Sequence, residues 1–346
     1  MKALVYRGAY TIELEDVSDP SLIDDQDVIV KVELCAICGS DLHIFHGEGF
    51  VPGTGYCVGH EAVGEIVEIG RGVFNRKVGD RVMISAAPGC GACLRCVRGD
   101  TRNCLDGKQN VFGVGTGLGG CQAQGVRVPA GDFNTALIPE GVSLVQALML
   151  TDALPTAWFG CKSADVSPGG TVAIIGAGPI GQLAVLCSFV LGASRVFVVE
   201  PNPDRRLFAE QIGAQAFAPD DAVALIEEAT KGLMVDSVIE IVGTEQTIKL
   251  AIRLARRMGS VAAIGGSRLK HVAFPNRYAF SKGLTFRVGT TSVPLYWPEL
   301  IPLVQAKRLT PESVVTHRMS LDQGAVAYRQ LDGKLDRILK SVLSLS

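Results

Sequence analysis

The segment Gly176-Ala177-Gly178-Pro179-Ile180-Gly181 restricts the fold of this chain more than any other feature, because of what lies on either side of it. The preceding residues, Thr171–Ile175, form a short β-branched run that is typical of a buried strand. The following residues, Ile180–Leu191, have the length and the periodicity of a helix. A strand, a glycine-rich turn and a helix in this order predict the start of a parallel α/β sheet.

The same alternation continues towards the C-terminus. Further strands are predicted at Arg195–Glu200, Val235–Ile241 and Ser260–Ile264, and further helices at Pro203–Ile212 and Gln246–Arg257. Strands that alternate with helices form a sheet covered by crossover helices, which is the doubly wound Rossmann arrangement. We therefore expect a dinucleotide-binding domain over residues 154–289.

The glycines of this segment match G-x-G-x-x-G, a pattern that is weak alone but informative between a strand and a helix. Gly176 permits the tight turn, Gly178 lets the backbone approach a pyrophosphate, and Gly181 lets the helix pack closely on the strand. The helix that begins near Pro179 and Ile180 directs free N–H groups towards the phosphates. These five residues are the predicted cofactor-binding turn.

Glu200 lies at the end of the next predicted strand, 19 residues beyond Gly181. A carboxylate at this point can accept hydrogen bonds from both ribose hydroxyls and would repel a 2′-phosphate, so it favours NAD over NADP. Arg205, on the helix that follows, is a further candidate for contact with the cofactor. The alternative is a turn rich in glycine followed by a solvated glutamate.

Four of the ten cysteines crowd into a lobe at residues 90–104, namely Cys90, Cys93, Cys96 and Cys104. In a reducing compartment such a cluster indicates a metal rather than disulfides. Four thiolates complete a tetrahedral zinc site without a water, so this zinc would be structural. An iron–sulfur centre also uses four cysteines, but no other feature of the sequence suggests electron transfer.

A second set of potential ligands is dispersed along the chain. Cys38 follows one predicted strand, and His60 with Glu61 opens another. A thiolate and an imidazole are good zinc ligands, and a catalytic zinc needs a third ligand and one open position. Asp152 is our candidate for the third ligand, although an aspartate there is also typical of a helix N-cap. Glu61 is a second candidate oxygen ligand.

Composition and charge limit the possible partners. Lys and Arg number 33 and Asp and Glu number 35, so the formal net charge is −2, and no basic patch for nucleic acid or an anionic membrane is evident. No apolar run reaches the roughly 18–20 residues of a membrane span, and Met1–Arg7 lacks the apolar core of a signal peptide. We therefore expect a cytoplasmic protein.

Residues 1–150 have a pattern that is typical mostly of β-strands. Asp27–Leu34 and Val63–Ile69 are β-branched and often alternating, with Gly, Pro and Asp at their borders. A length of 346 residues is more than one core usually supports, which predicts two domains. We assign residues 1–153 and 290–346 to a β-rich catalytic domain into which the Rossmann domain is inserted.

These motifs together resemble the zinc-containing medium-chain dehydrogenase/reductase family, the zinc alcohol dehydrogenases. Gly59-His60-Glu61-Ala62-Val63-Gly64, followed by Gly70 and Val73, is similar to the zinc signature of that family. Cys38-Gly39-Ser40-Asp41, the four-cysteine lobe and the glycine turn also occur in the order of the family. The resemblance covers essentially the whole chain and implies a GroES-like fold for the catalytic domain.

The resemblance also implies roles for individual residues. Cys38, His60 and Asp152 would hold the catalytic zinc, with Glu61 nearby, so that each chain would bind two zinc ions. Many relatives have Cys where this chain has Asp152, and others have Asp. Ser40 would accept the proton of the substrate hydroxyl, which would pass through the ribose hydroxyl of the cofactor to His43. His43 on a surface loop, with no such role, is the alternative.

The activity implied is reversible hydride transfer between an alcohol and NAD, with zinc as the Lewis acid. Phe50, Trp158, Tyr296 and Trp297 are apolar candidates for a substrate pocket and favour a secondary or aromatic alcohol, although each also suits ordinary packing. Polyol, threonine and formaldehyde-type dehydrogenases of the same family are alternatives, as is a non-catalytic sensor of NAD or zinc. The family further implies a homotetramer or a dimer.

Overall fold

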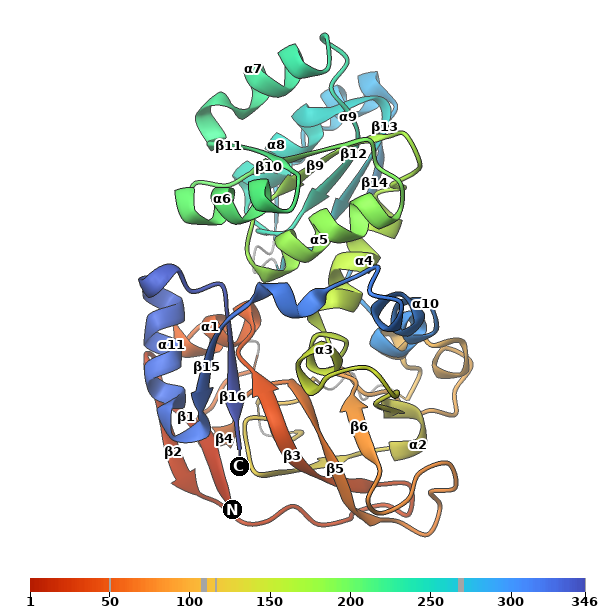
Figure 1. Cartoon of the computed structure of the whole chain (residues 1–346), viewed down its shortest axis with the longest axis vertical. Coiled ribbons are helices and arrows are strands. Elements are labelled where there is room, and N and C mark those ends of the chain that lie inside the picture. Colours follow the sequence, from red (N-terminus) through yellow and green to blue (C-terminus); the bar gives the residue numbers. More distant parts are fainter. Residues whose placement is uncertain (50, 107–110, 116, 267–270, 346) are drawn as a thin grey trace. The chain divides into compact units, whose positions relative to one another are not determined.

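A computed structural model describes residues 1–49, 51–106, 111–115, 117–266 and 271–345 of the chain (Figure 1). The chain divides into two compact units. Unit 1 comprises Met1–Pro155 and Ser292–Ser346, and unit 2 comprises Thr156–Thr291. The boundaries predicted from the sequence, after residues 153 and 289, lie two residues earlier than these. The helix α4 (Ala153–Ser163) carries the chain across the first boundary.

Unit 2 contains a six-stranded sheet in which every neighbouring pair is parallel. Its order is β11-β10-β9-β12-β13-β14, so the chain starts in the middle, runs to one edge and returns to build the other half. This is the strand order of a Rossmann fold. The strands are β9 (Thr171–Ile175), β10 (Arg195–Val199), β11 (Gln215–Phe217), β12 (Val235–Glu240), β13 (Ala255–Ala263) and β14 (Thr285–Val288).

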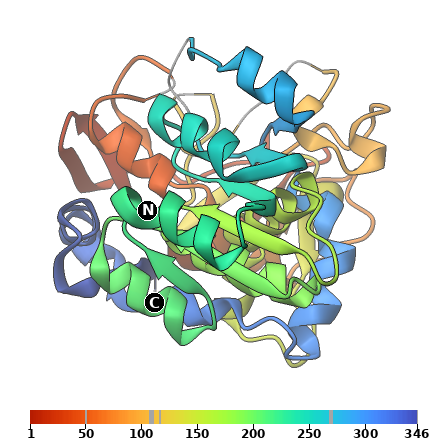
Figure 2. The ribbon, with the colours of Figure 1, turned by 90° about the horizontal axis from the view of Figure 1, so that it is seen from above.

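Helices cover both faces of this sheet (Figures 1 and 2). On one face α5 contacts α6, and on the other α7 contacts α8. The helices of the unit, after α4, are α5 (Pro179–Val190), α6 (Pro203–Gln211), α7 (Pro219–Ala229), α8 (Glu245–Leu254) and α9 (Asn276–Lys282). Pro occupies the first helical position of α5, α6 and α7, where its missing N–H costs nothing.

The structure corrects one predicted helix and adds elements that were not predicted. The helix expected at Gln246–Arg257 ends at Leu254, because Ala255 is already extended and begins β13. Arg256 leaves the helical pattern to donate from Nε to Asp236 of β12 at 2.6 Å. The strand β11, the helix α7 and the edge strand β14 had no distinct signal, since β11 and β14 are only three and four residues long.

Unit 1 is built on two sheets. The larger has the order β15-β16-β3-β5-β6-β8, with β7 also paired to β3, and the smaller has the order β2-β1-β4. The C-terminal strand β16 returns to pair antiparallel with β3, so both ends of the chain build this unit. The strands are β1 (Lys2–Gly8), β2 (Thr11–Asp16), β3 (Val28–Ala36), β4 (Tyr56–Cys57), β5 (Glu61–Ile69), β6 (Arg81–Ile84), β7 (Gly125–Val128), β8 (Thr135–Leu137), β15 (Val315–Ser320) and β16 (Lys340–Ser344).

Short helices connect these strands. They are α1 (Gly39–Phe45), α2 (Gly131–Asn134), α3 (Leu144–Met149), α10 (Val293–Gln305) and α11 (Gly324–Gly333). Five 3-10 turns complete the described elements: η1 (Cys96–Arg98), η2 (Thr101–Asn103), η3 (Pro311–Val314), η4 (Leu321–Gln323) and η5 (Leu335–Arg337). None of the helices in the described ranges has the length and apolar character that crossing a membrane requires.

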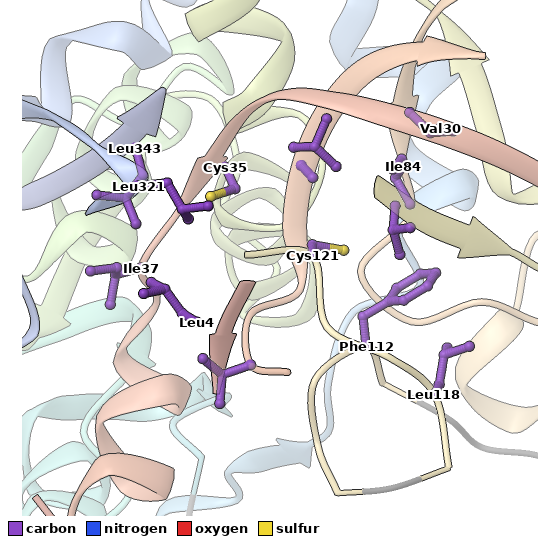
Figure 3. Close-up of a cluster of buried hydrophobic side chains, with 14 of the residues drawn as sticks. Leu4, Val30, Cys35, Ile37, Ile84, Phe112, Leu118, Cys121, Leu321 and Leu343 are labelled. Atoms are coloured by element: carbon purple, nitrogen blue, oxygen red, sulfur yellow. The ribbon is translucent and has the colours of Figure 1, made fainter. Parts of the chain in front are cut away.

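The core of unit 1 joins residues from both ends of the chain (Figure 3). Leu4 and Cys35 from the N-terminal part lie in one buried cluster with Leu321 and Leu343 from the C-terminal part. Cys35 is fully buried, and burial raises the pKa of its thiol well above the ordinary range. It therefore acts as a small apolar side chain rather than as a redox partner of Cys38.

Candidate active site

The four cysteines of the 90–104 lobe converge on one point. The Sγ atoms of Cys90, Cys93, Cys96 and Cys104 all lie within 4.8 Å of one another. All ten cysteines of the chain are free thiols, so none of the four is held in a disulfide. Four sulfur atoms gathered this closely have the number and the chemistry that a tetrahedral zinc site requires.

Backbone N–H groups of the lobe point at these sulfur atoms. The N–H of Cys96 donates to Cys93 Sγ at 3.5 Å, and that of Leu105 donates to the same atom at 3.4 Å. These hydrogen bonds lower the pKa of the Cys93 thiol to about 6. Burial instead raises the pKa of Cys96 to about 12. The lobe thus stabilises the thiolate of Cys93 and buries the thiol of Cys96. This environment suits a bound cation that ionises all four cysteines.

The second ligand set also converges, although its members come from distant parts of unit 1. Cys38 precedes α1, His60 precedes β5, and Asp152 lies between α3 and α4. The Asp152 Oδ2 atom is 3.7 Å from Cys38 Sγ and 3.5 Å from His60 Nε2. Together with Glu61, these residues offer ligand atoms that all lie within 4.8 Å of one another.

Gly59 shows why a glycine must precede His60. Its φ of +90° lies in the region that favours glycine, and a Cβ there would stand 2.4 Å from Gln122 Cγ. A larger residue would push His60 away from the cluster. The Gly59-His60 pair of the sequence motif is therefore required by the backbone as well as by the chemistry of the imidazole.

Asp41 orients two members of the cluster at once. Its Oδ2 atom accepts the N–H of Cys38 at 2.9 Å, and its Oδ1 atom is 3.2 Å from His60 Nδ1. The imidazole is thereby directed so that Nε2 faces Cys38 and Asp152. A carboxylate behind a metal-binding histidine commonly sets its tautomer and its orientation in this way.

Asp41 is itself held by a buried amide. Gln122 donates from Nε2 to Asp41 Oδ2 at 3.3 Å and to the carbonyl of Ala36 at 3.1 Å. The hydroxyl of Tyr328 donates to Gln122 Oε1 at 2.9 Å. Gln122 and Tyr328 are fully buried. A chain of hydrogen bonds therefore runs from α11 to Asp41, whose carboxylate in turn contacts the imidazole of His60 at 3.2 Å.

Glu61 is bound to a lysine from the other end of the chain. Lys340 Nζ lies 2.7 Å from both carboxylate oxygens of Glu61, and both side chains are almost wholly inaccessible to solvent. Although burial disfavours the ammonium, the carboxylate of Glu61 raises the pKa of Lys340. A buried pair with this geometry holds Glu61 beside the cluster.

The electrostatics of the cluster favour a cation. Burial raises the pKa of the Cys38 thiol, although the neighbouring His60 partly lowers it. The carboxylates of Asp41, Glu61 and Asp152 lie around the same point. A divalent cation would offset these negative charges and ionise the thiol. The residues present therefore fit a zinc ion of the catalytic type, with one thiolate, one imidazole and one carboxylate.

Ser40 and His43, the predicted proton relay, both lie on α1. Ser40 Oγ is 3.8 Å from Cys38 Sγ, so its hydroxyl borders the cluster. His43 is three residues further on, in the last turn of the helix, and both side chains are half-buried. Residues spaced by three lie on one side of a helix, which places the two groups in sequence along that side.

The glycine turn of unit 2 has the close contacts that its motif predicts. A Cβ on Gly181 would stand 2.0 Å from the carbonyl oxygen of Gly176, so the helix packs directly on the turn. Gly176 itself has a φ of +98°. Gly178 is the N-cap of α5, Pro179 is its first residue and Ile180 follows, so the first N–H groups of this helix lack helical partners.

Glu200 lies directly behind this turn. Its Oε2 atom accepts the N–H of Ala177 at 2.7 Å, and its Oε1 atom accepts the N–H of Asn202 at 2.9 Å. Each carboxylate oxygen retains capacity for a further donor such as a ribose hydroxyl. The Nη1 atom of Arg205 lies 3.9 Å from the Cβ position of Gly178, which brings a positive charge to the turn.

Of the four aromatic candidates for a substrate pocket, two are buried, one is half-buried and one lies outside the described residues. Trp297 is buried and donates from Nε1 to the carbonyl of Leu150 at 3.0 Å, so it supports the segment that carries Asp152. Trp158 is buried in unit 2. Tyr296 is half-buried. Phe50 lies outside the described residues.

Sequence reasoning did not assign a role to Asp41, Gln122 or Lys340. Asp41 had a local signal, since it closes the Cys38-Gly39-Ser40-Asp41 motif and satisfies the N–H of Cys38. Lys340 had no local signal in the sequence, because 279 residues separate it from Glu61. Only the pairing of β16 with β3 brings the two together.

Comparisons with known proteins show the family to which this chain belongs. The model of the alcohol dehydrogenase GroES-like domain matches residues 24–140, and that of the zinc-binding dehydrogenases matches residues 179–306. A protein of Mycobacterium tuberculosis described as a probable zinc-binding alcohol dehydrogenase is 40% identical over 329 residues, which cover 95% of this chain and 84% of the relative.

Solved structures share the whole fold. Alcohol dehydrogenase TADH from Thermus sp. ATN1 is 33% identical with a TM-score of 0.95, and the alignment covers 100% of both chains. A protein from Sinorhizobium meliloti 1021, whose structure was solved bound to NADP, is 26% identical with a TM-score of 0.86 over 99% of both chains. This chain is an oxidoreductase and belongs to the zinc-containing medium-chain dehydrogenase/reductase family.

Proposed function

We propose that this protein is an NAD-linked zinc alcohol dehydrogenase that interconverts an alcohol and its carbonyl compound. The observation that carries the proposal is the convergence of Cys38, His60 and Asp152, three side chains of different ligand chemistry, within one buried cluster. When bound, zinc polarises the substrate oxygen as a Lewis acid and NAD accepts the hydride. A secondary or aromatic alcohol is the substrate class that we favour.

The residues of the chain have distinct tasks in this proposal. Cys38, His60 and Asp152 hold the metal, and Asp41 keeps the imidazole of His60 in the ligating orientation. Asp152 directly precedes α4, so it serves both as ligand and as the residue at the start of that helix. Glu61 stays bound to Lys340 at the edge of the cluster and is available as a transient ligand.

Ser40 and His43 would remove the proton that the alcohol loses. The hydroxyl of Ser40 accepts a hydrogen bond from the substrate hydroxyl, and the proton leaves towards His43 on the same helix. A histidine that titrates near neutral pH is a suitable end for such a relay. The position of Ser40 Oγ beside Cys38 Sγ supports this role.

The four-cysteine lobe would hold a second, structural zinc ion. Four thiolates leave no open position for a substrate, so this metal stabilises the fold of residues 90–104. The ten free thiols are consistent with a reducing compartment, and we propose the cytoplasm.

Glu200→Gln is expected to raise KM for NAD by about tenfold or more and to reduce the preference for NAD over NADP. The neutral amide offers one acceptor oxygen instead of two and no longer repels a 2′-phosphate. KM for both coenzymes, with one alcohol at saturation, measures the effect. Glu210→Gln, an exposed glutamate on α6, is the matched control and should leave both values unchanged. Equal KM for NAD in wild type and Glu200→Gln would contradict the assignment.

We also propose a homo-oligomer, a tetramer rather than a dimer, that uses the edge strand β14. Three large apolar side chains at this edge of unit 2 are exposed: Val288 of β14 at 75%, Phe280 of α9 at 85% and Met258 of β13 at 75%. Met258 and Gly283 are neighbours, since a Cβ on Gly283 would stand 2.7 Å from Met258 Sδ. An open sheet edge beside apolar side chains is typical of a subunit contact.

Val288→Lys should therefore reduce the oligomer to a smaller species. The reason is that an ammonium group would have to be buried in the contact without a partner. Sedimentation velocity of the purified protein at several concentrations measures the change. Leu233→Lys alters a side chain of similar exposure, 71%, in the loop between α7 and β12 and should leave the mass unchanged. An unaltered sedimentation coefficient for Val288→Lys would exclude β14 from the contact.

A further inference from the structure

Gln122 lies between the two chain segments that carry the candidate zinc ligands Cys38 and His60. Its backbone N–H donates to the carbonyl of Val58 at 2.9 Å, two residues before His60. Its side-chain amide reaches the other segment and donates from Nε2 to the carbonyl of Ala36 at 3.1 Å, two residues before Cys38. Gln122 is fully buried. One buried residue therefore links both segments by direct hydrogen bonds.

The same amide restrains Asp41, which contacts both ligands. Nε2 of Gln122 donates to Asp41 Oδ2 at 3.3 Å, and this oxygen also accepts the N–H of Cys38 at 2.9 Å. The other oxygen, Oδ1, lies 3.2 Å from His60 Nδ1. Neither Oδ1 nor Nδ1 has a hydrogen-bond partner elsewhere among the described residues. The rotation of the Asp41 carboxylate therefore decides how it meets the imidazole, and Gln122 limits that rotation.

The direction of the Gln122 amide is determined by the groups around it. Nε2 faces two acceptors, the carbonyl of Ala36 and the carboxylate of Asp41. Oε1 accepts the hydroxyl of Tyr328 at 2.9 Å. A reversed amide would place its carbonyl oxygen against two acceptor oxygens. Burial raises the pKa of Tyr328 well above its ordinary value, so the phenol keeps the proton that Oε1 requires.

Tyr328 is a rigid support for this amide. It belongs to α11, is fully buried, and has its ring centroid 5.6 Å from that of Phe45 in α1. Its ring is part of the apolar core of unit 1, as is Cys121, which directly precedes Gln122. An apolar side chain of similar size would fill this space without burying polar groups. The amide is therefore best explained by the groups that it orients.

We propose that Gln122 is a positioning residue for the catalytic zinc. Its amide, directed by Tyr328, sets the separation and the orientation at which Cys38 and His60 meet the metal. The inference rests on the proposed function, since it requires that this cluster binds zinc. Hydrogen-bond partners of metal ligands commonly change metal affinity by about tenfold to a hundredfold. Gln122 would act in the same way on two ligands at once, through Asp41 and through the end of β3.

Gln122→Met tests the proposal, because methionine has a similar length and volume but forms no such hydrogen bonds. We expect the catalytic zinc to bind about tenfold to a hundredfold more weakly. Transfer of zinc from the purified holoenzyme to a chelator measures the affinity. The zinc of the four-cysteine lobe is an internal reference and should be retained as in wild type. Gln124→Met, at an exposed position two residues further on, is the matched control.

Cobalt provides a readout that is independent of turnover. Co²⁺ is exchanged into the catalytic site, where its visible absorption depends on the identity and the geometry of the ligands. The absorption bands should shift in Gln122→Met and remain unchanged in Gln124→Met. A role in packing alone would lower the melting temperature of Gln122→Met without moving these bands.

Tyr328→Phe provides a second, milder variant. It keeps the ring in the core and removes only the donor to Oε1 of Gln122, so the chain should fold even if Gln122→Met does not. Zinc affinity at the catalytic site should fall by about twofold to tenfold, the usual effect of one hydrogen bond. For both variants we expect a lower kcat/KM for the alcohol and an unchanged KM for NAD.

Two results would overturn the proposal. One is wild-type zinc affinity and an unaltered cobalt spectrum in whichever of the two variants fold. The other is an equal loss of zinc from the catalytic site and from the four-cysteine lobe, which would assign Gln122 to general stability. If wild type binds zinc at the cluster but oxidises no alcohol, the proposed function fails, and the zinc and cobalt measurements still decide the role of Gln122.

Discussion

Cys38→Ser is expected to lower kcat/KM for alcohol oxidation by about a thousandfold or more, the largest catalytic effect that we predict. A serine hydroxyl is a far weaker ligand than a thiolate for zinc, and its shorter side chain does not reach the same point. Without zinc, the substrate oxygen is not polarised and its proton is not acidified. Steady-state rates at the nicotinamide absorbance measure the effect.

Metal analysis gives the expected result a second, independent test. Wild type should contain two zinc ions per chain, and Cys38→Ser should retain one, in the four-cysteine lobe. Cys57→Ser is the matched control, because its half-buried thiol lies on β4, outside both sulfur clusters. Full turnover by Cys38→Ser, or two zinc ions still bound to it, would show that the metal assignment is wrong.

Lys340→Met is expected to lower the free energy of unfolding by about 3–5 kcal/mol, the largest effect on stability that we predict. Methionine has similar length but no charge, so the carboxylate of Glu61 would be left buried without its partner. A loss of this size corresponds to a decrease in melting temperature on the order of 10 °C. Thermal unfolding monitored by circular dichroism, with zinc held constant, measures it.

The double variant Lys340→Met with Glu61→Leu distinguishes loss of the ion pair from loss of packing as the cause of the lower stability. Two apolar residues of similar volume often replace a buried ion pair at little cost, so most of the lost stability should return. Lys77→Met, an exposed lysine in unit 1, is the control and should be within about 0.5 kcal/mol of wild type. If the double variant is as unstable as Lys340→Met, the ion pair is not the cause.

Features that depend on short stretches of chain were predictable from the sequence. The turn at Gly176–Gly181 requires glycines because a Cβ would collide with backbone atoms only five residues away. The four cysteines of the lobe lie within fifteen residues, so one loop brings them together. Strands β9, β10 and β12 and helices α5 and α6 were predicted within one or two residues of their ends.

The sequence was less informative where tertiary contacts outweigh local preference. The helix expected to continue through Arg257 stops at Leu254, because Ala255 and the residues after it pair with β12 and Arg256 bonds to Asp236. Sheet pairing and one charged hydrogen bond thus outweigh the helical propensity of two arginines. The short edge strands had too few residues to show a period.

The candidate active site was likewise predictable only in part from the sequence. Residue types and spacing within each motif identified Cys38, His60 and Asp152 as possible ligands, because thiolate, imidazole and carboxylate are distinguished by their own chemistry. Only the packed structure brings their ligand atoms within 4.8 Å, and only it places Lys340 against Glu61 across 279 residues. Contacts between such distant residues depend on how strands pair and cores pack, which no local pattern specifies.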